Sequence, residues 1–142
     1  MAIEFEIFPE QKLLRAQLGE TCDAESFQDY LARRDADPRF DLEFRRLMDA
    51  RRLLDLPTPG AMRELVRYLE TGNPRRVRIA FVASRDAAYG MFRMLEILSD
   101  LNGYEHRAFR DLEEAEAWLG IGTEGQDEEV RTAGGVSEWP RT

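Results

Sequence analysis

The sequence predicts an α/β fold, a single domain with a five-stranded, mostly parallel sheet and one antiparallel edge strand. Short apolar runs alternate with longer amphipathic stretches, in the order strand, strand, helix, strand, helix, strand, helix, strand, helix. Residues 77–82 are dense in β-branched and aromatic side chains, which is typical of an interior parallel strand. Because helices separate the later strands, we expect right-handed crossovers, sequential strand order and helices mainly on one face.

The first two strands are predicted to form a hairpin. Residues 2–8 alternate apolar and polar side chains, as in a half-buried strand, and Pro9 breaks the pattern. Residues 13–18 supply the second strand, which is expected to pair antiparallel with the first. Asp23 is a suitable N-cap for a helix that runs to about Ala36.

A third strand and a second helix follow. The strand is predicted over 44–50, although Arg45 and Arg46 make it unusually charged. The helix is expected to start with Thr58 as its N-cap and Pro59 at the favoured first helical position. The β-α-β-α rhythm on either side supports both elements.

The fourth strand leads directly into the third helix. Residues 76–83 supply the strand, Ser84 is the expected N-cap of the helix, and Asp86 places a negative charge in its first turn. Leu101-Asn102-Gly103 is expected to close this helix. Residues 104–109 are then predicted to form the fifth strand.

The last predicted helix begins at a capping box that opens with Asp111, and Gly120 ends it. The folded domain is therefore expected to span 1–120. Residues 121–142 are acidic and without periodicity, as in a flexible tail, although Trp139 is a candidate for docking on the domain.

Composition excludes several classes of partner. The net charge of −8 argues against a general affinity for nucleic acid or anionic membranes. No apolar run approaches the roughly 20 residues of a membrane span, and the N-terminus lacks the pattern of a signal peptide. The single cysteine, Cys22, suits a reducing compartment. We expect a cytoplasmic protein with no integral membrane segment.

Several segments carry a family resemblance. They are Ile79–Ala83, Ala88–Met91, Arg93-Met94, Glu96, Phe109–Ala115 and Trp118–Gly120, and the most specific is Tyr89-Gly90-Met91 with Arg93-Met94. In these segments the chain resembles the bacterial SpoIIAA-like proteins over residues 2–120. These small cytoplasmic proteins are related in fold to STAS domains and to the lipid-binding lobe of CRAL-TRIO proteins. For most of the family no activity is established, so the resemblance implies a fold more than a function.

The STAS resemblance also implies a test of regulation. In anti-sigma-factor antagonists, a serine in an Asp-Ser-Ser-Gly turn is phosphorylated. The matching turn here reads Pro57-Thr58-Pro59-Gly60, so Thr58 alone keeps a hydroxyl. We predict that Thr58 is a structural cap and not a kinase target.

No catalytic, metal or cofactor site is predicted. His106 is the single histidine, Cys22 has no partner at metal-ligand spacing, and no glycine-rich phosphate loop occurs. Arg51, Arg85 and Arg110 follow three strands at the carboxyl edge of the sheet, where they are candidate anion contacts. The alternative for these arginines is surface pairing with nearby aspartates.

The third helix is the strongest functional lead because it is apolar on two sides. One stripe comprises Ala88, Met91, Phe92, Leu95 and Leu98, and a second, rotated stripe comprises Gly90, Met94, Ile97 and Leu101. Three interpretations remain open: packing against neighbouring helices, a surface for a partner or a second copy, and the wall of an apolar cavity.

We therefore expect a non-enzymatic, STAS-like protein-interaction or regulatory module. The residues expected at its ligand or partner surface are Tyr89, Gly90, Met91, Phe92, Met94 and Ile97. A homodimer that contacts through or beside residues 90–101 is expected, and a tail folded over this stripe would leave a monomer instead. The alternative function is a small carrier or sensor that binds a lipid or other amphiphile in a closed apolar pocket of several hundred cubic ångströms.

Overall fold

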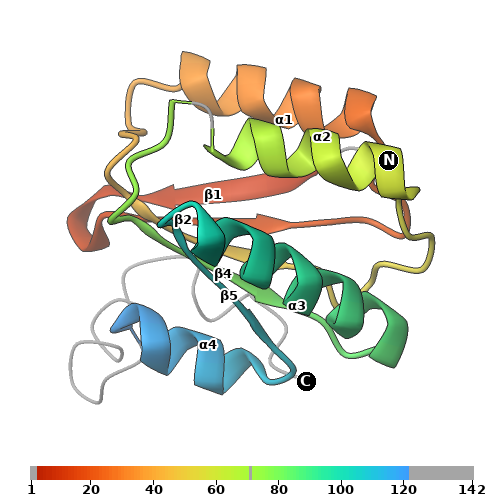
Figure 1. The fold of residues 1–142 in the computed structure, drawn as a ribbon. Coiled ribbons are helices and arrows are strands. Elements are labelled where there is room, and N and C mark those ends of the chain that lie inside the picture. The colour runs from red at the N-terminus through yellow and green to blue at the C-terminus, as the bar shows by residue number, and fades with distance from the viewer. Residues whose placement is uncertain (1–2, 71, 122–142) are drawn as a thin grey trace.

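A sheet with the strand order β1-β2-β3-β4-β5 lies at the centre of the described chain (Figure 1). The computed structural model describes residues 3–70 and 72–121. The strands are β1 (Glu4–Phe8), β2 (Leu13–Gln17), β3 (Arg45–Asp49), β4 (Arg78–Val82) and β5 (Glu105–Phe109). The helices are the 3-10 turn η1 (Pro9–Gln11), α1 (Ala24–Ala36), α2 (Pro59–Glu70), α3 (Asp86–Leu101) and α4 (Leu112–Leu119).

The sheet has the topology that the sequence predicts. β1 and β2 form an antiparallel hairpin in which Glu4 lies opposite Gln17, and the remaining neighbours are parallel. The hairpin turns through η1 and Lys12, whose φ of 54° lies in the left-handed region. The predicted α/β class, sequential strand order and antiparallel edge strand are confirmed.

The helices form two layers. Figure 1 shows α1, α2 and α3 over one face of the sheet and α4 over the other. Because both faces of β4 are covered, Ile79 and Phe81 enter the core under α1–α3, whereas Ala80 and Val82 pack toward α4. This arrangement explains why β4 reads as a continuous apolar run. It also confirms the expectation that the helices lie mainly on one face.

The two arginines of β3 donate hydrogen bonds at the entry of the strand. Arg46 is 2% exposed, and it donates to the Asn73 side chain at 2.9 Å and to the Leu42 carbonyl at 2.8 Å. Arg45 reaches the carbonyls of Gln11 and Leu119. Burial lowers the pKa of Arg46 to about 10. Through these hydrogen bonds both arginines hold neighbouring segments against the first residues of β3.

Side-chain caps begin most of the helices where the sequence predicts them. Asp23 accepts from the Ser26 N–H at 2.8 Å, and Asp111 accepts from the Glu113 N–H at 3.0 Å. The prediction for α3 is wrong, because its N-cap is Arg85 and no side chain caps this helix. The Ser84 carbonyl instead accepts from the Arg110 side chain at 3.0 Å.

The folded part of the chain includes Ile121. Its N–H donates to the Glu116 carbonyl at 2.9 Å across Gly120, whose φ is +79°, and its side chain is buried against α4. The rest of the predicted tail, with Trp139, lies outside the described residues. Within 3–70 and 72–121, no helix has the length and apolar character needed to cross a membrane.

Candidate functional site

The inner face of α3 fixes the helix on the sheet. Its buried residues are Ala88, Phe92, Leu95 and Ser99. The Phe92 ring stacks on the Phe81 ring of β4, with a centroid distance of 5.0 Å and an interplanar angle of 12°. The Ser99 hydroxyl lies 2.9 Å from Nδ1 of His106 in β5. These contacts leave the opposite face of α3 pointing away from the sheet.

That opposite face carries an apolar stripe, called the outer stripe below: Gly90, Met94, Ile97 and Leu101. The side chains of Met94, Ile97 and Leu101 are 58%, 54% and 77% exposed, the three highest values among the large hydrophobic residues that the structure describes. Gly90 is exposed as well, and a Cβ added there would meet nothing within 4 Å. Contiguous exposed apolar surface of this kind marks an interaction site more often than an ordinary surface.

The sequence-predicted surface residues divide between two faces of α3. Gly90, Met94 and Ile97 lie on the outer stripe. Phe92 is 4% exposed and belongs to the core, so it is not available to a partner. Tyr89 and Met91 are half-buried against that core. The physical reason is the helical repeat, which places consecutive residues about 100° apart, so a contiguous segment cannot form one surface.

Leu101 completes the outer stripe. It is the last residue of α3 and is more exposed than Met94 or Ile97. Its spacing of four residues from Ile97 is the signal that assigns it to the stripe.

The three predicted anion contacts do not converge on one open site. Arg51 turns back to Asp49, with Nε–Oδ1 at 2.9 Å and Nη2–Oδ2 at 2.8 Å, and these hydrogen bonds raise the pKa of Arg51. Arg110 lies 2.6 Å from an Asp86 oxygen. Arg85 is exposed at the start of α3. Two of these arginines therefore form the ion pairs that were the alternative to anion binding.

Two open hollows border β5, between α3 and α4. One, of about 360 Å³, adjoins Ile97 and Leu101, and the other, of about 470 Å³, adjoins Tyr89 and Arg110. The Arg110 guanidinium lies 5.1 Å from the centre of the Tyr89 ring. Both hollows mix polar and apolar walls and open to solvent.

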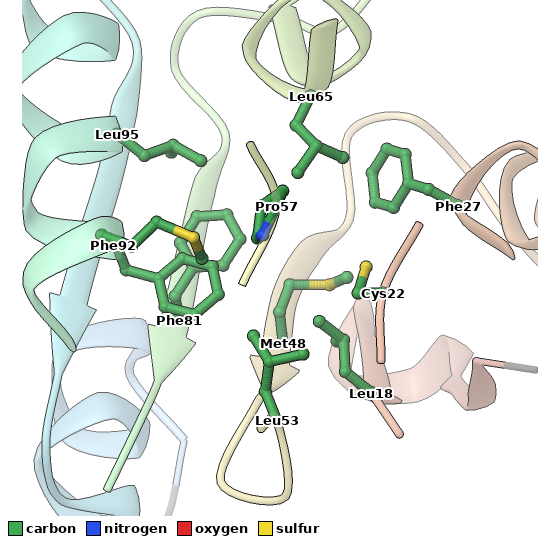
Figure 2. Close-up of a pocket in the computed structure, with 11 residues that line it drawn as sticks. Leu18, Cys22, Phe27, Met48, Leu53, Pro57, Leu65, Phe81, Phe92 and Leu95 are labelled. Carbon is green, nitrogen blue, oxygen red and sulfur yellow. The ribbon is translucent and has the colours of Figure 1, made fainter. Parts of the chain in front are cut away.

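A smaller apolar cavity lies inside the molecule, where α1, α2 and α3 meet the sheet. Figure 2 shows its lining, in which Phe92 and Leu95 of α3 face Met48, Cys22 and Phe27. Its volume is about 30 Å³. A cavity of this size holds about one water molecule, not a lipid chain.

His106 and Cys22 are held in unreactive forms. Burial, and then the positive charge of Arg46, lower the pKa of His106 to about 4, so its imidazole is neutral at pH 7. Burial raises the pKa of the Cys22 thiol to about 11, so the nucleophilic thiolate is scarce. Among the described residues, no cluster of three or more His, Cys, Asp and Glu side chains has the geometry to hold a metal ion.

Thr58 serves as a helix cap. Its hydroxyl accepts from the Ala61 N–H at 3.2 Å, and its carbonyl accepts from the Met62 N–H at 2.8 Å. This is the structural role that the sequence predicts for it.

A buried ion pair on the α4 side was not found by the sequence reasoning. Arg15 of β2 contacts Glu116 of α4, and their side chains are 2% and 5% exposed. Arg15 interrupts the apolar run of Leu13, Leu14 and Ala16, and that interruption is the signal that a buried partner is needed. The pair joins α4 to the sheet on the face opposite α3.

Family models, curated proteins and solved structures were compared with this chain, and none of them matches it.

Proposed function

We propose that this protein is a non-enzymatic protein-interaction module whose binding surface is the outer stripe of α3. The observation that carries the proposal is the exposure of Met94, Ile97 and Leu101 on a helix whose other face is fully packed. Exposed methionine and aliphatic side chains on one helix face form an adaptable apolar surface that fits another helix.

Packing within the domain does not use this surface. α3 packs on β5 beneath it and on α2 beside it, while α4 lies on the far face of the sheet (Figure 1). Of the three interpretations of the doubly apolar helix, internal packing accounts for the inner stripe only. No residue that the structure describes covers the outer stripe, which leaves it available to a partner.

The carrier alternative has less support. A carrier needs a closed apolar pocket of several hundred cubic ångströms. The apolar cavity beside Phe92 and Leu95 has a volume of about 30 Å³, and the larger hollows along β5 are open and partly polar. A packed interior with an exposed apolar stripe is the combination that favours an interaction module.

The family resemblance and the cytoplasmic location remain part of this proposal. The sheet order and helix placement agree with the fold that the SpoIIAA-like resemblance implies. A single, buried cysteine agrees with a reducing compartment. Regulation by a phosphate on Thr58 is not part of the proposal, because that hydroxyl caps α2.

Site-specific photo-cross-linking tests the proposal. A photoreactive amino acid replaces Leu101 on the outer stripe or, as a matched control, the exposed Glu64 of α2 in the full-length chain. In cells of the native host, we expect protein adducts from position 101 and none from position 64. Equal adducts at both positions, or none at position 101, would contradict the proposal.

A further inference from the structure

We propose that the partner of the outer stripe is a second copy of this chain, with the two α3 helices packed antiparallel across a twofold axis. In this arrangement Leu101 of each copy sits over Gly90 of the other. The inference rests on the proposed function, because it names the occupant of the same surface. Four features of α3 support it.

The first feature is the spacing of the stripe. Its residues stand at 90, 94, 97 and 101, which is the alternation of four and three residues found in the seam of a helix pair. A helix that faces a broad core has a wider apolar band. The narrow outer stripe therefore fits one opposing helix better than a broad partner surface.

The second feature is that the stripe is complementary to itself. A twofold axis that passes between Met94 and Ile97 places Met94 opposite the partner's Ile97. The same axis places Gly90 opposite the partner's Leu101. Each end of the stripe thus joins the smallest side chain to the most exposed one. A parallel pair would instead set glycine against glycine and leave a void.

The third feature is Gly90 itself, since no contact or backbone angle in the part of the chain that the structure describes requires a glycine there. It is not among the glycines with positive φ, so its backbone conformation is open to any residue. A Cβ at this position would meet nothing within 4 Å, so neighbouring atoms do not exclude a side chain. Glycine also weakens the interior of a helix. A hole that receives the partner's Leu101 explains why this position is glycine.

The fourth feature is the charge beside the stripe. Arg93 and Asp100 lie on the same flank of α3, each immediately before a stripe residue, and the Arg93 guanidinium lies 2.5 Å from the Glu96 carboxylate of its own helix. Antiparallel packing brings Arg93 of each copy, still paired with its own Glu96, near the partner's Asp100, so one further opposite-charge contact is added on each side of the axis. The charges therefore favour the same orientation as the side-chain sizes.

Association through the β5 edge of the sheet is less favourable. β5 is an edge strand, and such edges can pair with a second copy. Here the Glu96 side chain of α3 accepts from the Ala108 N–H at 2.9 Å. This contact occupies a backbone donor that a paired strand would need.

Sedimentation equilibrium of the full-length protein tests the size complementarity. We expect a concentration-dependent dimer. Gly90→Leu should raise its dissociation constant tenfold or more, because the new side chain fills the space that receives the partner's Leu101. The Gly90→Leu monomer should stay folded, because the site has open space. Gly60→Leu is the matched control on α2, where a Cβ also meets nothing, and should leave the dimer unchanged. A dimer insensitive to Gly90→Leu would overturn the proposal.

A charge reversal tests the orientation independently. Arg93→Asp and Asp100→Arg should each weaken the dimer about fivefold, and the double variant should return it to within about twofold of wild type. Two additive losses without rescue would contradict antiparallel packing.

The outcomes separate this proposal from the interaction module. If the wild type is monomeric, with a dissociation constant of about 1 mM or weaker, and position 101 cross-links to other proteins, the module stands and the second copy is refuted. If position 101 cross-links only to residues 122–142 of its own chain, or to nothing, both proposals fail.

Discussion

Arg15 and Glu116 meet in the interior between the sheet and α4, although they are 101 residues apart in the sequence. Their side chains are 2% and 5% exposed, so neither charge has access to bulk water. Asp49 and Arg51 form a second ion pair with little exposure, at 2.8 Å. The packing of α4 against the sheet therefore depends on charge pairing as well as on its apolar residues.

We predict that Glu116→Gln destabilises the domain by about 3–5 kcal/mol, because it leaves the buried charge of Arg15 without its carboxylate. Removing both charges, as Arg15→Met with Glu116→Leu, should restore stability to within about 1–2 kcal/mol of wild type. Urea unfolding at pH 7 measures both effects. The exposed pair Arg76–Glu43 supplies the control, since Glu43→Gln should change the free energy of unfolding by less than about 0.5 kcal/mol.

His106 should make the protein sensitive to mild acid. Its pKa is about 4 in the folded protein against an ordinary value of 6.5, so the unfolded chain binds a proton in this interval that the folded chain does not. Stability attributable to His106 is therefore present above pH 6.5 and falls toward pH 4, by about 1.4 kcal/mol per pH unit at most. His106→Asn, which keeps a polar group near Ser99, should unfold with a shallower pH dependence than wild type. Parallel curves between pH 7 and 4.5 would show that His106 does not carry the effect.

Thr58 should matter for stability and not for signalling. Thr58→Ala removes the acceptor for the Ala61 N–H and should cost about 1 kcal/mol in urea unfolding, whereas Thr58→Ser should be nearly neutral. Mass spectrometry of protein from the native host should find no phosphate on Thr58. A stoichiometric phosphate there would contradict its assignment as a cap alone.

Local patterns were sufficient to predict the elements and their order. Alternation in residues 2–8, the density of β-branched residues near Ile79 and the cap at Asp23 each act within a few residues. Sheet order then follows from chain connectivity, because helical crossovers between parallel strands have a fixed hand. For this reason the strand order and a main helical layer on one face could be predicted without any knowledge of side-chain contacts, although the helix on the opposite face could not be identified.

Contacts between distant segments could not be predicted in this way. Arg15 in an apolar strand signals a buried acid, but nothing local distinguishes Glu116 from the other acidic residues of the chain. The candidate surface illustrates the same limit, because Phe92 and Met94 differ in exposure only through the orientation of α3 on β4. The missed start of α3 has a local cause, since extended Arg85 shifts the helix one residue beyond the expected cap.

Light scattering of the full-length chain and of the variant Met94→Glu with Ile97→Glu tests the role of the outer stripe most directly. The two substitutions set like charges opposite each other across the twofold axis, and Leu54→Glu, at an apolar site that is 45% exposed between β3 and α2, is the control. As the concentration rises, the wild type and the control should approach twice the 16.5 kDa mass of one chain, while the stripe variant stays a folded monomer. A wild type that remains at 16.5 kDa, or a stripe variant that dimerises as well as the control, would contradict self-association through α3.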